Sequence, residues 1–152
     1  MEADPKYAIA WGYLANALSL SVLWQPVDDA FPAARSAYQR ALALDPDQSQ
    51  ALSAKALRLI LYDQDWGGAS QLYQHAMKSR DDTFAKIGYG AFIAHAIDRP
   101  DQSVSMYREA EQRDPLHAGI KANLGNFLLL TGDTEKSIKK ANEALELEPD
   151  HI

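Results

Sequence analysis

The chain of 152 residues contains no cysteine. This absence excludes disulfide bonds, thiol catalysis and metal sites built on cysteine ligands. It leaves the compartment open, because a chain without cysteine suits an oxidising and a reducing environment equally well.

Basic residues are in the minority. The chain has 15 Lys and Arg against 21 Asp and Glu, which gives a formal net charge of −6. Nucleic-acid binding needs a basic surface, and here the basic residues are scattered, apart from a short cluster of Lys136, Lys139 and Lys140 that is typical of a solvated helix face. We therefore expect no nucleic-acid partner for this segment.

Long apolar runs are also missing. No uninterrupted apolar stretch approaches the roughly 18 residues of a membrane span, and the start at Met1-Glu-Ala-Asp-Pro5 lacks the design of a signal peptide. With 47% apolar and 24% charged residues, the composition is that of a folded, soluble chain.

Catalytic and metal-binding patterns are absent as well. The histidines are too far apart for the i, i+4 spacing of a zinc site; they are His75, His95, His117 and His151. Asp63 and Asp65, followed by Gly68, resemble the start of a calcium loop, but its twelfth position holds Gln74 in place of the required Glu. We interpret this segment as turn and helix-cap chemistry, and we expect no enzyme, no metal site and no cofactor.

What the chain does contain is a repeat. A small residue is followed four places later by an aromatic residue or alanine, seven later by alanine, and twelve later by a residue that ends a helix. The four sets start 35, 34 and 34 residues apart, which is the period of a two-helix solenoid. The sets are Ala34/Tyr38/Ala41/Pro46, Ala69/Tyr73/Ala76/Asp81, Ser103/Tyr107/Ala110/Pro115 and Ser137/Ala141/Ala144/Pro149.

The repeat predicts a single domain over 1–152, with units at about 6–46, 47–81, 82–115 and 116–149. The expected helix pairs are 7–20 with a helix ending at 44, 49–62 with 67–79, 84–97 with 101–113, and 117–130 with 134–148. The first unit is seven residues longer than the period. Because Pro26 and Pro32 fall in the extra stretch, we expect a loop insertion at 21–32.

These motifs resemble a known family. Trp11-x2-Leu14-Ala15, followed by the set from Ala34 to Pro46, resembles the tetratricopeptide repeat (TPR) signature, and Leu124-Gly125 with Ala144 repeats it. The resemblance covers essentially the whole chain. It implies an all-α, right-handed superhelix of about four helix-turn-helix repeats that binds a protein or peptide partner.

A narrower resemblance lies in 31–46 and 61–69. These stretches are similar to TPR regions of bacterial signalling proteins, where they follow a winged-helix domain of the CadC or ToxR kind or a class III adenylate cyclase domain. The resemblance implies a regulatory or sensory segment, cytoplasmic or periplasmic, of a longer bacterial protein. Two alternatives stay open: an assembly scaffold in a secretion or envelope complex, and a small-molecule sensor.

In the TPR family the first helices of successive repeats line a concave groove. This implies groove residues that form a mostly small and apolar trough, suited to a peptide with aliphatic side chains. The candidates are Asn16, Gln50, Ser53, Leu57, Ile60, Tyr89, Phe92, His95, Asn126 and Leu129. The Lys, Asn and Arg set that clamps an acidic C-terminus in chaperone-binding members is not present there. Leu57, Ile60 and Phe92 suit the inter-helix core equally well.

Three apolar features suggest further contacts. Trp24 and Phe31, in the expected loop, either fold back on the first unit or dock a partner, whereas we expect Trp66 to be a buried packing residue. The last helix keeps Ile138, Ala141, Ala144 and Leu145 on a spacing that expects a neighbour. We therefore expect homo-oligomers formed through uncapped repeat ends.

Overall fold

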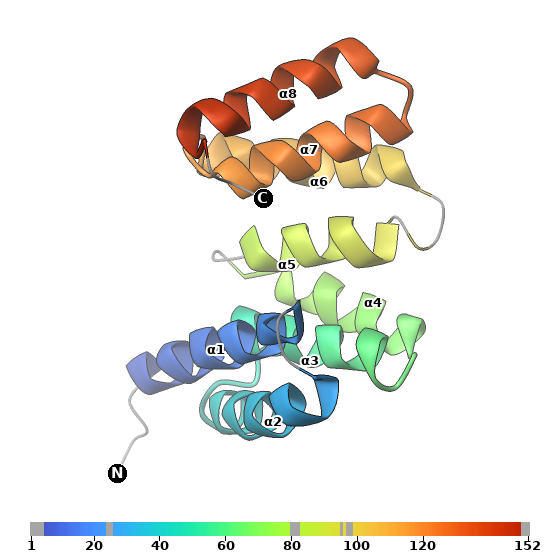
Figure 1. Cartoon of the computed structure of the whole chain (residues 1–152). Coiled ribbons are helices and arrows are strands. Elements are labelled where there is room, and N and C mark those ends of the chain that lie inside the picture. The colour runs from blue at the N-terminus through green and yellow to red at the C-terminus, as the bar shows by residue number, and fades with distance from the viewer. Residues whose placement is uncertain (1–4, 24–25, 80–82, 95, 97–98, 150–152) are drawn as a thin grey trace. The chain divides into compact units, whose positions relative to one another are not determined.

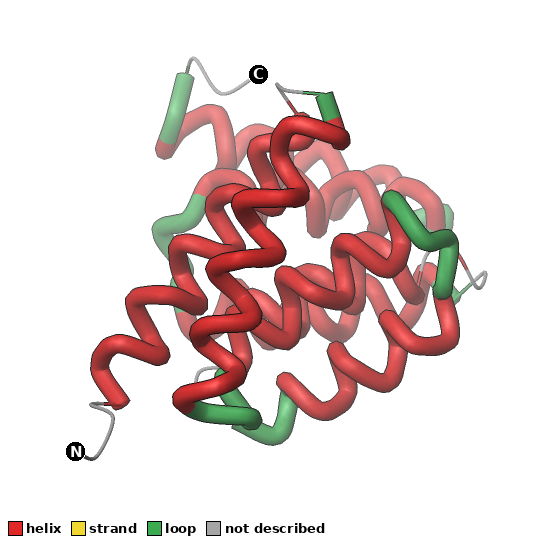
Figure 2. Tube along the Cα trace, turned by 90° about the horizontal axis from the view of Figure 1, so that it is seen from below, coloured by secondary structure: helices red, strands yellow, loops and turns green. Residues whose placement is uncertain are grey.

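A computed structural model describes residues 5–23, 26–79, 83–94, 96 and 99–149. Within these residues the secondary structure is entirely helical (Figure 2). In chain order (Figure 1) the elements are α1 (Pro5–Leu20), the 3-10 turn η1 (Ser21–Leu23), α2 (Val27–Leu44), α3 (Ser49–Leu61), α4 (Trp66–Ala76), α5 (Thr83–Gly88), the π-helix η2 (Tyr89–Ala94), α6 (Pro100–Arg113), α7 (Ala118–Leu130) and α8 (Thr134–Leu147).

The helices fall into two compact units, residues 1–85 and 86–152. In the first unit α1 pairs with α2, α3 pairs with α4, and α3 also lies against α1 and α2. The core between them is built mainly from alanines, with Tyr38 as its large member. Small side chains let helix axes approach closely, so the alanine positions of the repeat are the packing positions of this unit.

In the second unit α6 packs against η2 and α7, and α7 packs against α8. The core consists of Val104, Tyr107, Ala110, Ile120, Leu124, Phe127 and Leu128. The rings of Tyr107 and Phe127 lie 5.2 Å apart between centroids. A Cβ at Gly125 would lie 3.2 Å from the carbonyl oxygen of Ser137, so this glycine permits the close approach of α7 and α8.

Local sequence signals explain where the last helices begin and end. Pro100 opens α6 in its first turn, where a proline is tolerated. Between α7 and α8, Gly132 adopts a left-handed φ of 84° and the Asp133 side chain accepts a hydrogen bond from the backbone of Lys136. The helices predicted at 117–130 and 134–148, with a turn at 131–133 between them, are confirmed within one residue at each end.

Two expectations are wrong in detail. Residues 27–32 are not a loop, because α2 begins at Val27 and contains Pro32. A proline there removes one hydrogen bond near the helix start, and burial of Phe31, Ala34 and Tyr38 along the same helix offsets that loss. The helix expected over 84–97 changes at Tyr89 from α to π geometry. Inside the π segment, the carbonyl of Gly90 accepts a 2.7 Å hydrogen bond from the Ser103 hydroxyl.

Candidate functional site

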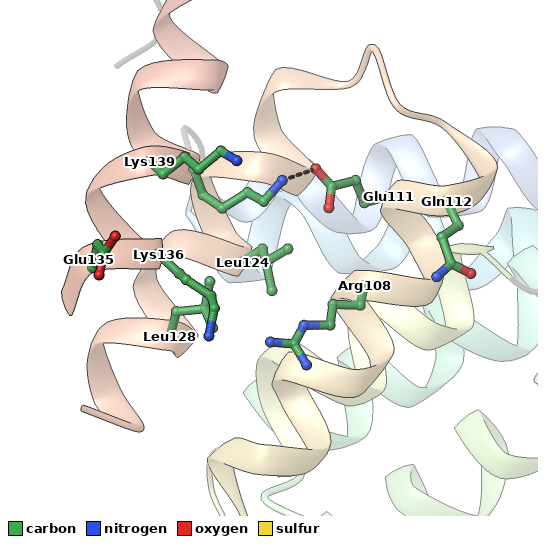
Figure 3. A pocket seen from close by; sticks show the side chains of 9 residues that line it. Arg108, Glu111, Gln112, Leu124, Leu128, Glu135, Lys136 and Lys139 are labelled. Atoms are coloured by element: carbon green, nitrogen blue, oxygen red, sulfur yellow. Dashed lines mark hydrogen bonds and ion pairs between the residues drawn. The ribbon is translucent and has the colours of Figure 1, made fainter. Parts of the chain in front are cut away.

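A hollow of about 490 Å³ lies in the second unit, where α6, α7 and α8 meet (Figure 3). Its walls come from α6 and α8, which are successive second helices of the repeat, and its floor comes from α7. The lining residues are Arg108, Glu111 and Gln112 of α6, Leu124 and Leu128 of α7, and Glu135, Lys136, Lys139 and Lys140 of α8.

Helical spacing places these side chains on common faces. Residues three and four apart share one side of a helix, so Arg108, Glu111 and Gln112 point the same way from α6. Leu124 and Leu128 are one turn apart on α7 and almost completely buried. The hollow therefore has an apolar floor under polar walls.

Two lysines and two glutamates tie the three helices together at one end of the hollow. Glu111 accepts hydrogen bonds from the Nζ atoms of Lys121 at 2.8 Å and Lys140 at 2.7 Å. Glu143 accepts from the same two ammonium groups, at 3.2 Å from Lys121 and 2.7 Å from Lys140. Each charge of this cluster thus faces two charges of the opposite sign.

The cluster also shifts the pKa values of its members. Burial by itself raises the pKa of Glu111, but the hydrogen bonds from Lys121 and Lys140 outweigh it and hold that pKa below its usual value. The pKa of Lys121 is raised, chiefly by its hydrogen bond to Glu111. Both shifts favour the charged forms, so the cluster is an ion-paired clamp at neutral pH.

The remaining charges of the hollow are mostly basic. Lys136 pairs with Asp133 at 2.5 Å, whereas Arg108 and Lys139 make no hydrogen bond or salt bridge to any residue that the structure describes. Figure 3 shows Arg108 reaching from α6 toward the side where Lys136 and Leu128 lie. Four of the six charged lining residues are basic, so this surface is locally positive on a chain whose net charge is −6.

The predicted groove residues differ in how far the structure buries their side chains. Those that are buried are Asn16, Gln50, Ser53, Leu57, Ile60 and Tyr89. Phe92 is half-buried, while Asn126 and Leu129 are exposed. The members from Asn16 to Ile60 belong to the first unit and those from Tyr89 to Leu129 to the second, so the groove stays a prediction.

Two of the buried members, Gln50 and Ser53, hold local structure. Gln48 caps α3 by accepting a hydrogen bond from the backbone of Ala51 at 2.7 Å, and its amide donates to the side chain of Gln50. The hydroxyl of Ser53 donates to the carbonyl of Ser49 at 2.8 Å. Their polar groups are engaged within the unit.

The apolar contact candidates divide as well. Trp24 and His95 lie outside the residues whose side chains the structure describes. Phe31 is buried and meets Tyr62 edge to face at 6.2 Å between ring centroids. Trp66 opens α4 and stays 43% exposed, so the expectation that it is buried is wrong, because the first turn of a helix lies at the edge of the hairpin.

Sequence reasoning missed the hollow, although a signal for it existed. Lys136, Lys139 and Lys140 were interpreted as a solvated face because only their own helix was considered. In a two-helix solenoid, successive second helices lie side by side. The basic face of α8 could therefore have been matched with Arg108 and Glu111 on the preceding second helix.

Two further searches covered the described residues. They contain no group of three or more His, Asp or Glu side chains arranged to hold a metal ion. None of their helices combines the length and the apolar character that crossing a membrane requires.

Comparisons with known proteins agree with the helical hairpins. Residues 96–152 match the tetratricopeptide repeat family model, and no curated protein matches the chain. The structure of PilF from Pseudomonas aeruginosa is similar over 97% of the chain, at a TM-score of 0.69 and 14% identity. A structure of MamA is similar over 78% of the chain, at a TM-score of 0.62 and 16% identity, with 68% of the MamA chain covered.

The chain spans 64% of the length of the PilF structure. Identities this low bear on the fold alone, while the family match rests on the repeat pattern of residues 96–152. The same two-helix pattern recurs along the rest of the described chain. The match thus places residues 96–152 among tetratricopeptide repeats, and the described chain shares its helical fold with the two solved structures.

Proposed function

We propose that the chain is a non-catalytic protein-interaction module and that its hollow between α6 and α8 receives an acidic peptide segment. The observation that carries this proposal is the surplus of basic side chains around the hollow on a chain that is acidic as a whole. Helical repeat arrays act by presenting extended binding surfaces.

The chemistry of the walls suits carboxylate groups. The guanidinium of Arg108 can hold a carboxylate with two parallel hydrogen bonds, and Lys139 supplies a second cation on the facing helix. The amide of Gln112 can donate to or accept from a peptide backbone. A volume of about 490 Å³ lies within the usual range of ligand pockets, roughly 300–1,000 Å³.

The test is fluorescence anisotropy with a labelled Glu-Ala repeat peptide and its Gln-Ala counterpart. We expect the acidic peptide to bind and the neutral one to bind far more weakly. Arg108→Ala should weaken binding at least about tenfold, the equivalent of one charge-assisted hydrogen bond. Arg35→Ala is the matched control, since Arg35 is an exposed arginine on α2 in the other unit.

Salt provides a second readout. Because Arg108 and Lys139 form no salt bridge with any described residue, their charges are available to the peptide. Binding should therefore weaken as ionic strength rises and the Debye length falls below about 8 Å. Equal binding of the two peptides, or equal affinity of the Arg108→Ala and Arg35→Ala variants, would overturn the proposal.

We further propose that the module is the regulatory or sensory segment of a bacterial signalling or transcription-regulatory protein. The support is the resemblance of 31–46 and 61–69 to the TPR regions of such proteins. The genomic reading frame around the segment tests it. A winged-helix or cyclase domain before the repeats would agree, whereas a frame holding only further repeats would favour the assembly scaffold.

A further inference from the structure

Helix α8 exposes an apolar face that none of the described residues covers. Ile138 is 58% exposed and Leu145 is 49% exposed, and Ala141 between them is exposed as well. Within α8 only Ala144 is buried. Positions 138, 141 and 145 share one side of the helix.

The same face is covered one repeat earlier. The residues 34 positions before Ile138 and Ala141 are Val104 and Tyr107 of α6, which are 7% and 1% exposed. They belong to one core cluster with Ile120 and Phe127 of α7. The face that α8 leaves open is therefore the one that α6 uses to bind α7.

Among the residues that the structure describes, α1 exposes the complementary face. Aligning Leu14-Ala15 of α1 with Leu124-Gly125 of α7 matches Ala10, Leu14 and Ala17 with Ile120, Leu124 and Phe127. The α7 residues are at most 7% exposed, whereas Leu14 is 44% exposed, and Ala10 and Ala17 are also exposed.

The composition of α1 points the same way. Its only charged residue is Lys6, and a helix that is apolar on all sides normally has partners on all sides. Helix α7 has the same composition, with Lys121 as its one charge, and packs against both α6 and α8. Helix α1 packs against α2 and α3, its Tyr13 meets Phe84 of α5 edge to face at 6.1 Å between ring centroids, and its Leu14 is 44% exposed.

The two open faces also match in polarity. Glu111 of α6 is paired with Lys121 of α7 at 2.8 Å. The equivalent positions hold Leu145 on α8 and Trp11 on α1. Trp11 is half-buried, because it packs beside the core of its own unit and lies under the Arg40 guanidinium at 4.6 Å from the ring centroid. The ion pair between α6 and α7 thus corresponds to two apolar side chains on α8 and α1.

We propose that α8 of one copy of the chain binds α1 of a second copy, repeating the packing of α6 on α7. The occupant is a second copy because one sequence supplies both halves of the contact, and both halves hold an apolar residue where the α6–α7 contact has the ion pair of Glu111 and Lys121. In the α6–α7 contact Tyr107 faces Phe127, whereas in the proposed contact Ala141 of α8 would face Ala17 of α1. The smaller alanine pair lets the two helices approach more closely. The contact joins different surfaces, so it builds a head-to-tail assembly.

Sedimentation velocity over a concentration series tests this with two single variants. Leu14→Lys disables the α1 face, and Ile138→Lys disables the α8 face. Both positions are exposed, so each variant should still fold, which far-UV circular dichroism checks. The wild type should associate as concentration rises. Each variant alone should need at least about tenfold higher concentration to associate, since each loses the burial of one large aliphatic side chain.

Mixing the two variants gives the decisive result. The Ile138→Lys variant keeps its α1 face, and the Leu14→Lys variant keeps its α8 face, so these two faces can bind each other. The other two faces are disabled. An equimolar mixture should therefore form a 1:1 complex and no larger assembly. Leu116→Lys, at a 75% exposed leucine in the turn between α6 and α7, is the control and should associate like the wild type. Three results would each overturn the proposal: the wild type stays monomeric, the single variants associate like the wild type, or the mixture of the two variants stays monomeric.

Discussion

Replacing Glu111 by Gln tests whether the charge cluster holds α6, α7 and α8 together. The Glu111 carboxylate accepts hydrogen bonds from Lys121 on α7 and Lys140 on α8, at 2.8 and 2.7 Å. Its side chain is 17% exposed. Glutamine keeps the size of the side chain and one acceptor oxygen but removes the charge.

The expected loss follows from the position of the cluster between surface and interior. Exposed ion pairs contribute about 0.2–1 kcal/mol, and hydrogen bonds to charged groups contribute about 1.5–3 kcal/mol. Glu143 still faces both lysines in the variant, so part of the interaction remains. We expect Glu111→Gln to lower the free energy of unfolding by about 1–2 kcal/mol at neutral pH.

The loss should depend on pH. The two lysines hold the pKa of Glu111 below its usual value in spite of burial. The carboxylate therefore stabilises the fold fully above the unfolded-state pKa of about 4.3. This stabilisation is lost as pH falls through the folded-state pKa. The gap between wild type and variant should therefore be full above about pH 5 and shrink below about pH 4.

Urea denaturation followed by far-UV circular dichroism is the assay, since all three tryptophans lie before residue 86 and would report on the first unit only. Glu146→Gln, at an exposed glutamate on α8, is the control and should change stability by less than about 0.5 kcal/mol. The reasoning is refuted if the two variants lose the same stability, or if the Glu111→Gln deficit stays constant as pH falls.

Three further changes probe the packing and the turns. Tyr107→Ala removes a ring that is 1% exposed and should cost about 3–5 kcal/mol in the same urea assay. Gly132→Ala places a side chain on a residue with a φ of 84° and should lower the free energy of unfolding by about 1 kcal/mol. Gly67→Ala is the control: its new Cβ would make only an ordinary contact in a helix, so it should not lower the thermal midpoint. Asp65→Ala removes the 2.8 Å cap on the backbone of Gly68 and should cost about 1 kcal/mol, read as a lower urea midpoint.

Much of the fold could be predicted because its signals are local. A proline at position 100, an aspartate before α8 and a glycine at 132 mark helix ends by their own backbone preferences. The start of α2 could not be predicted in this way, because Pro32 normally argues for a loop. Its helix persists because Phe31 and Tyr38 are buried along it, which is a tertiary effect that overrides local preference.

The candidate site was harder to predict because it depends on packing between helices. The family pattern places Leu57 and Ile60 on a first helix but cannot tell an open groove from an interior, and the structure buries both. The hollow needs Arg108 of α6 and Lys139 of α8 to face the same space. That arrangement follows from how two second helices lie side by side, and neither helix shows it alone.

The central claim is that this repeat protein binds an acidic peptide between α6 and α8. The most direct measurement is an NMR titration of the labelled chain with the Glu-Ala peptide, followed at each backbone amide and at the side chains of Arg108 and Gln112. The account predicts shifts that gather on 108–112 and 135–140 and disappear with Arg108→Ala. Shifts that gather instead around Asn126 and Leu129, or no shifts at all, would contradict it.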